Sequence, residues 1–160
     1  MTSSIFFAQT GDPPIELPET GEERVLLNLQ IPKCLKHSSF KVDSFFELNF
    51  LLAGATPLHV VEPAPFKIAL EYQLLDGIGD NCNEVTPRLA ETISGTVITG
   101  AENKNIDPVQ LESNTTPNLT AVCEELQESF YLVASVREIQ GVALLPTVQF
   151  RSLNAYTVRF

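Results

Sequence analysis

Between residues 40 and 52 the chain alternates between apolar and polar side chains, and this alternation constrains the fold more than any other feature. The even positions form one apolar row that contains a single serine, namely Phe40, Val42, Ser44, Phe46, Leu48, Phe50 and Leu52. The odd positions include Lys41, Asp43, Glu47 and Asn49. Because successive side chains of a strand point to opposite faces, this period of two predicts a long β-strand with one face on a core.

Similar patterns elsewhere predict a chain built almost entirely of strands. We expect strands at 24–31, 40–53, 66–76, 93–99, 118–123, 129–139 and 147–160, the last interrupted around 151–154, with Phe150, Tyr156 and Val158 on its apolar row. The segment 86–93 fits either one helical turn or a strand. Turn-rich segments predict loops at 54–65, 76–84 and 100–117. Long strands joined by long loops favour an all-β fold, an antiparallel β-sandwich of jelly-roll type.

The length of 160 residues suits one such domain, preceded by an extended N-terminal arm. We assign residues 1–23 to an N-terminal strand and a proline-rich arm, and residues 24–160 to the sandwich. Residues 10–23 contain three prolines and five acidic side chains, a composition that resists regular structure. Residues 4–9 are apolar enough to pair as a strand. We expect the arm to dock either on its own domain or on a neighbouring subunit.

The charge of the chain excludes several classes of partner. Twenty acidic residues against ten basic ones give a formal charge of −10, which repels nucleic acid and anionic membrane surfaces. No run approaches the roughly 18 apolar residues of a membrane span, so we expect no membrane insertion. The first nine residues lack the basic region of a secretory signal. We therefore expect synthesis in the cytoplasm and a place on a spore or other particle surface reached without Sec export.

The chain offers little material for catalysis or metal binding. Its two histidines are His37 and His59, both beside predicted loops, and its acidic pairs lie in polar runs. The loop 76–84 is rich in oxygen ligands but lacks the spacing of a calcium loop, so we expect a hairpin there. We predict no catalytic residues, no cofactor and no metal site, and therefore no enzyme.

Cysteines and apolar residues in polar surroundings are the candidate contacts between subunits. Cys34, Cys82 and Cys123 form no C-x-x-C pair, and they fit free thiols, an intermolecular disulfide or one internal bridge. Apolar side chains on the outer face of a strand indicate either a second covered face or an oligomer contact. The candidates for such a contact are Ile5, Phe6, Phe7, Phe45, Tyr131 and Val133.

Four stretches, at 25–32, 41–50, 72–77 and 117–120, resemble the small jelly-roll proteins of endospore surfaces, which are similar to tumour-necrosis-factor-like domains. The resemblance implies a subunit that assembles with copies of itself, as a trimer or a filament, in an exosporium or spore appendage. The expected function is thus that of a non-enzymatic structural protein. The alternatives are a carbohydrate- or receptor-binding module that uses the loops 54–65 and 100–117, or a virion decoration or tail-fibre subunit.

Overall fold

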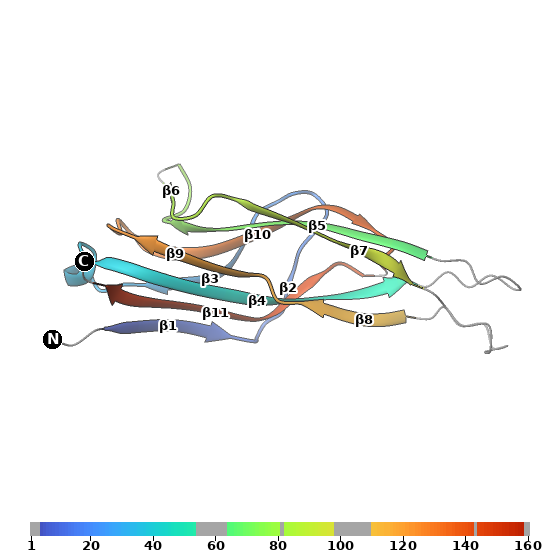
Figure 1. Ribbon diagram of the computed structural model, residues 1–160, viewed down its shortest axis with the longest axis horizontal. Helices are drawn as coiled ribbons and strands as arrows, with labels where there is room; N and C mark the ends of the chain where they lie inside the picture. The colour runs from blue at the N-terminus through green and yellow to red at the C-terminus, as the bar shows by residue number, and fades with distance from the viewer. Residues whose placement is uncertain (1–3, 54–63, 81, 98–109, 143, 159–160) are drawn as a thin grey trace, which may run out of the picture.

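The computed structural model describes residues 4–53, 64–80, 82–97, 110–142 and 144–158, and these form two antiparallel sheets packed face to face (Figure 1). Sheet A contains β1 (Ile5–Thr10), β2 (Ile15–Glu16), β4 (Ser39–Ala53), β8 (Gln110–Thr115), β9 (Asn118–Cys123) and β11 (Thr147–Val158). Sheet B contains β3 (Arg24–Gln30), β5 (Ala64–Asp76), β6 (Asn83–Glu84), β7 (Leu89–Val97) and β10 (Ser129–Gln140). The described helical structure is one 3-10 turn, η1 (Lys33–Leu35). None of the described helical structure is long and apolar enough to cross a membrane.

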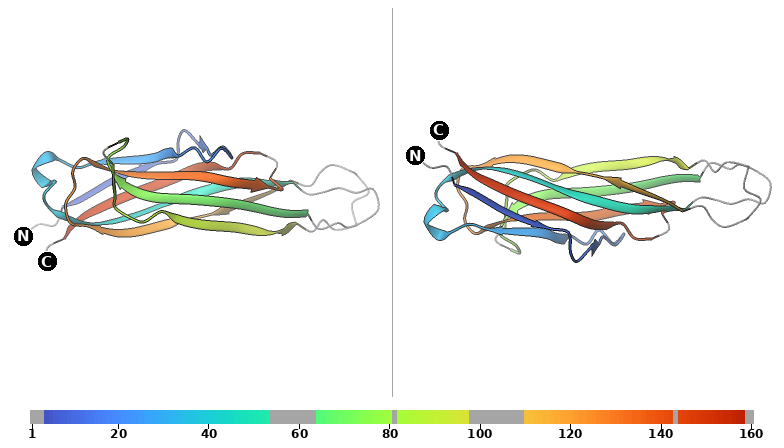
Figure 2. Two further views of the ribbon diagram at one scale, coloured as in Figure 1. Left: turned by 90° about the horizontal axis from the view of Figure 1, so that it is seen from above. Right: turned by 90° about the horizontal axis from the view of Figure 1, so that it is seen from below.

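The strand order is that of a jelly roll. β8 and β9 pair one after the other with β4, so together they act as one interrupted strand. Four of the pairings are nested along the chain: β1 with β11, β3 with β10, β4 with β8 and β9, and β5 with β7. Pairs nested in this way are those of one long hairpin rolled into two sheets, which is the double Greek key of a jelly roll. The predicted fold class is confirmed (Figure 2).

The alternation along β4 is confirmed residue by residue. All seven even positions from Phe40 to Leu52 are buried, with exposed fractions between 0% and 5%. The Phe46 ring meets the Tyr72 ring of sheet B edge to face, at a centroid distance of 5.6 Å. Each large apolar side chain buried in this way contributes about 1.5–3 kcal/mol, so β4 supplies one wall of the core.

The alternation along β11 is interrupted by a bulge, and the prediction for this strand is wrong in its second half. The register with β4 shifts between Val148 and Arg151, which places an extra residue in β11. Because one extra residue exchanges the two faces, Leu153 and Ala155 are fully buried and Phe150 is 37% exposed. The side chains of Phe150, Tyr156 and Val158, predicted to form the apolar row of this strand, therefore lie on the outer side of sheet A or at its margin.

The structure also differs from the prediction at two polar segments. The segment 110–115, placed in a loop by its polar side chains, is strand β8. The segment 86–93 contains no helix: β7 begins at Leu89, and the Thr86 hydroxyl accepts a hydrogen bond from the backbone N–H of Leu74 at 3.0 Å. The expected loops at 54–63 and 100–109 lie outside the described residues.

The N-terminal segment docks on its own domain. β1 and β2 both pair with β11, so they extend sheet A instead of standing outside the sandwich. Leu17 is fully buried, and its backbone N–H donates to the Pro146 carbonyl at 2.9 Å. Farther along, the Gly21 N–H donates to the Val136 carbonyl of β10 at 3.0 Å. Residues before 24 thus cover one side of the sandwich from sheet A to sheet B.

Candidate assembly surface

The outer face of sheet A carries exposed apolar side chains along its β1 edge. Ile5 and Phe7 are 61% and 70% exposed, and the register places them beside Tyr156 and Asn154 of β11. Phe6 points the other way and packs against the core. Of the three predicted contact residues in β1, Ile5 and Phe7 are therefore exposed on the outer face, whereas Phe6 is partly buried against the core.

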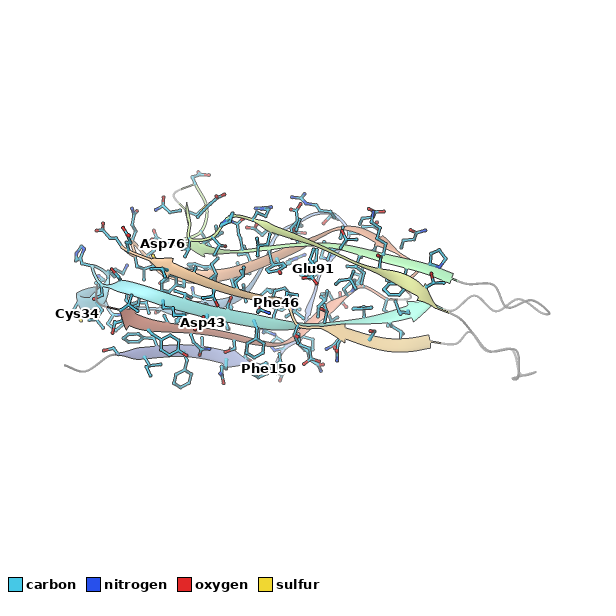
Figure 3. All side chains as sticks on the ribbon, viewed as in Figure 1. Cys34, Asp43, Phe46, Asp76, Glu91 and Phe150 are labelled. Atoms are coloured by element: carbon cyan, nitrogen blue, oxygen red, sulfur yellow. The ribbon has the colours of Figure 1, made fainter. Side chains whose placement is uncertain are left out.

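A second apolar group lies at the centre of the same face. The Phe45 ring of β4 and the Phe150 ring of β11 pack with a centroid distance of 5.6 Å, and each residue is 37% exposed. Figure 3 shows Phe150 on the outer side of sheet A, whereas Phe46 lies between the sheets. Phe150 was assigned to the core from the sequence, and only the bulge in β11 brings it to this surface. We call Ile5, Phe7, Phe45 and Phe150 the assembly surface.

The two contact residues predicted on the outer face of sheet B are less accessible than those of β1. Tyr131 is half-buried, and Val133 is only 1% exposed, so Val133 cannot contact another subunit. The reason is that Arg88 lies over this part of the sheet: its Nε donates to Gln73, which pairs with Val133. Val133 fits the alternative interpretation of apolar residues on an outer face, namely that this part of the face is covered within the same chain.

The three cysteines lie in different surroundings and are free thiols. Cys34, in η1 at one end of the sandwich, and Cys82 are exposed (Figure 3). Cys123 is buried, and burial raises the pKa of its thiol, with Asp76 adding to the effect. A raised pKa lowers the thiolate fraction, so Cys123 cannot serve as a cross-link between folded subunits. Cys34 and Cys82 remain available for one.

Two titratable side chains that stand out in the sequence, His37 and Asp76, make structural contacts. His37 faces Glu125 at 3.3 Å in an open, exposed pair, away from any enclosed cleft. Asp76, at the start of the predicted oxygen-rich loop, accepts the backbone N–H groups of Gln127 and Glu128 at 2.6 and 2.7 Å. Within the described ranges no three His, Cys, Asp or Glu side chains are close enough to hold a metal ion.

A groove with a mixed polar and apolar lining lies beside the assembly surface. It has a volume of about 950 Å³ and runs between β4, β8 and the start of β11. Its lining combines the exposed Leu144 and Leu145 with amides, and Asn49 Nδ2 donates to Gln149 Oε1 at 2.9 Å. The carboxylates of Glu16 and Glu47 complete the lining. The groove can offer hydrogen bonds to a polar ligand, and the aromatic residue among its described lining, Phe50, is only 5% exposed.

Comparison with known proteins gives matches among solved structures. No family model and no curated protein matches the chain. Among solved structures, the chain is similar to that of the infectious bursal disease virus Gx strain, with 11% identity and a TM-score of 0.26, over 99% of this chain and 42% of that chain. It is also similar to the VP2 subviral particle of infectious bursal disease virus, with 11% identity and a TM-score of 0.25, over 98% of this chain and 42% of that chain.

The chain thus spans less than half the length of these viral structures. The jelly-roll assignment rests on the strand order described above, because TM-scores of 0.25 and 0.26 are too low to establish a shared fold. The resemblance to endospore-surface proteins stays a prediction, since no family model or curated protein matches.

Proposed function

We propose that this chain is a non-enzymatic structural subunit that associates with copies of itself at the surface of a spore or another particle. The observation that carries the proposal is the β1 edge of sheet A, where Ile5 and Phe7 are 61% and 70% exposed. Exposed apolar side chains that gather along one edge are typical of a surface that another protein covers. The Phe45 and Phe150 rings extend this apolar surface toward the centre of the sheet.

The charge of the chain is consistent with assembly through this face. Each copy carries a formal charge of −10, so close approach of two copies requires a region that is free of acidic side chains. β1 contains no charged residue, and Lys41 and Asp43 on β4, two strands away, form a 3.4 Å ion pair with each other. The assembly surface is therefore the place where two copies meet with the least repulsion.

Light scattering on the purified chain at micromolar concentration tests this function. We expect a defined oligomer or filament, and we expect the double variant Ile5→Lys, Phe7→Lys to be monomeric with an unchanged circular dichroism spectrum. The matched control is Leu144→Lys, Leu145→Lys, which adds the same two charges at exposed leucines outside the assembly surface. A wild-type chain that stays monomeric at these concentrations contradicts the proposal.

The groove between β4, β8 and β11 supports a second candidate, a carbohydrate-binding module. Amide and carboxylate side chains such as Asn49, Gln149 and Glu16 are the groups that bind sugar hydroxyls, and all three line the groove. Glycan-array binding that is lost in Asn49→Ala but kept in the β1 variants would favour this candidate. The absence of binding together with a stable oligomer favours the structural role.

A further inference from the structure

Within the part of the chain that the structure describes, β1 pairs with β11 alone, so its other edge is open and presents backbone hydrogen-bonding groups from alternate residues. The backbone N–H of Thr157, in the neighbouring strand β11, donates to the Ser4 carbonyl at 3.0 Å. In an antiparallel pair the residues that exchange hydrogen bonds alternate, so Phe6 and Ala8 direct their backbone groups toward β11. The N–H and C=O groups of Ile5, Phe7 and Gln9 then point away from the sheet, at its open edge.

β1 also lacks the features that protect most edge strands. Proteins commonly block sheet edges with charged residues, prolines or bulges. The sequence of β1, Ile-Phe-Phe-Ala-Gln-Thr, contains no charge and no proline, and its register with β11 has no shift. At the opposite edge of sheet A, by contrast, β8 and β9 are separated by Thr116 and Pro117. β1 is therefore the edge of sheet A that is best suited to accept another strand.

We propose that β1 pairs antiparallel with β1 of a second copy around a two-fold axis at Phe7. The inference rests on the proposed self-association and specifies its geometry. With Phe7 opposite its own copy, Ile5 lies opposite Gln9, and all the outward-pointing backbone groups of Ile5, Phe7 and Gln9 are paired. A register shifted by two residues would pair Ile5 with Phe7 and leave Gln9 without a partner among these three residues. That register would therefore pair fewer of the outward-pointing backbone N–H and C=O groups.

The side chains favour the same arrangement. The residues whose backbone faces the edge are also those whose side chains lie on the outer face of sheet A, because both follow the period of two. Pairing at Phe7 places the two exposed phenyl rings side by side on the outer face, where cross-strand aromatic pairs stabilise a sheet. Sheet A would then continue from one subunit into the next.

A second copy of the chain fits this edge better than an unrelated partner. A two-fold interface uses the same patch on both subunits, so a patch must complement itself. An uncharged strand meets this requirement, since no charge is brought opposite its own copy, whereas a charged edge such as β7 with Glu91 would repel itself across the axis. The backbone groups can be paired only by another extended strand, and the chain itself carries that strand.

Cysteine cross-linking tests the register directly. In the background Cys34→Ser, Cys82→Ser, which removes both exposed thiols, we place single cysteines in β1 and oxidise mildly. Directly opposite Cα atoms in a hydrogen-bonded pair lie about 5.5 Å apart, within the range of a disulfide. We expect a covalent dimer from Phe7→Cys, and from Ile5→Cys combined with Gln9→Cys.

Two variants serve as controls for this cross-link. Ile5→Cys alone should not cross-link, because the two copies of Ile5 lie roughly 14 Å apart along the strands. Val122→Cys, an exposed position at the opposite edge of sheet A, measures cross-linking by random collision. These surface positions keep the core unchanged, and circular dichroism checks the fold of each variant.

The outcomes distinguish the register from the function. An oligomer in light scattering without a Phe7→Cys dimer above the Val122→Cys level overturns pairing at β1 and leaves self-assembly standing. If Phe7→Cys gives no dimer on its own but Ile5→Cys combined with Phe7→Cys does, the proposed register is wrong. A monomer with no cross-link overturns both this inference and the proposed function.

Discussion

Arg151 Nε donates a 2.7 Å hydrogen bond to the carbonyl of Leu26, which joins β11 of one sheet to β3 of the other through the core. Leu26 is the residue that the register of β3 with β10 skips, so its carbonyl lies at a bulge. Arg151 Nη1 also donates to Gln149, in the bulge of β11, and to Pro13 in the N-terminal segment, each at 3.0 Å. One buried guanidinium thus binds carbonyls at both bulges and in the arm.

Replacing Arg151 should destabilise the sandwich strongly. Burial lowers the pKa of the Arg151 guanidinium, an effect that Asp12 opposes, yet arginine stays protonated in proteins. Arg151→Met keeps the apolar length but removes the donor of the buried Leu26 carbonyl and of two partly buried carbonyls, and we expect a loss of about 3 kcal/mol in unfolding free energy. Urea denaturation measures it. Arg24→Met, which removes an exposed ion pair with Glu22, should change it by less than about 1 kcal/mol, and equal losses would contradict this role.

Asp76 should be required for the connection between β9 and β10. Its carboxylate accepts the N–H groups of Gln127 and Glu128, and the residue is only 2% exposed. Asp76→Asn places an amide N–H against one of these donors, so we expect a loss of about 2 kcal/mol, measured by thermal and urea unfolding. Asp80→Asn, at an exposed position in the loop between β5 and β6, is the control and should be nearly neutral.

Glu71 should make the free energy of unfolding depend on pH in the acidic range. The hydrogen bond from Arg137 Nε, at 3.0 Å, holds the pKa of Glu71 below its usual value, with burial opposing and Arg88 adding to the effect. A lowered folded-state pKa contributes stability that is fully present above the unfolded-state value of about 4.3 and is lost as the pH falls through the folded-state value.

Glu71→Gln should therefore be less stable than the wild type at pH 7, by less than about 1 kcal/mol because the network is partly exposed. The difference should shrink as the pH is lowered toward 3, as followed by urea unfolding across this range. Glu84→Gln, an exposed position in β6, serves as the control. A difference that stays constant with pH would argue against the ion-pair network as its cause.

Strand patterns could be predicted from the sequence where each face is occupied by one kind of side chain. β4 is the clearest case, since its period of two continues for 13 positions without a bulge, from Phe40 to Leu52. The bulge in β11 could not be predicted, because bulges depend on pairing with β4, and so Phe150 was assigned to the wrong face. β8 was missed because its side chains, Gln-Leu-Glu-Ser-Asn-Thr, are mostly polar.

The candidate site was predictable to a similar extent. Ile5, Phe7 and Phe45 are exposed as expected, because an apolar residue on a polar face is visible in the sequence itself. Val133 was not, since the side chain that covers it, Arg88, comes from a distant segment. The open edge of β1 likewise depends on strand order, which no local pattern contains.

Leu17 provides the test of whether the N-terminal segment is part of the folding unit. The side chain is 0% exposed and belongs to the core cluster, although it lies in a proline-rich stretch. Leu17→Ala should leave a cavity and lower the unfolding free energy by about 2–5 kcal/mol in urea denaturation, whereas Leu144→Ala, at a 65% exposed leucine, should be nearly neutral. Deleting residues 1–23 removes β1, β2 and Leu17 together, so we expect that chain to be unfolded. A truncated chain that keeps its β spectrum and a cooperative unfolding transition would show instead that residues 24–160 fold alone and that the segment before them is dispensable.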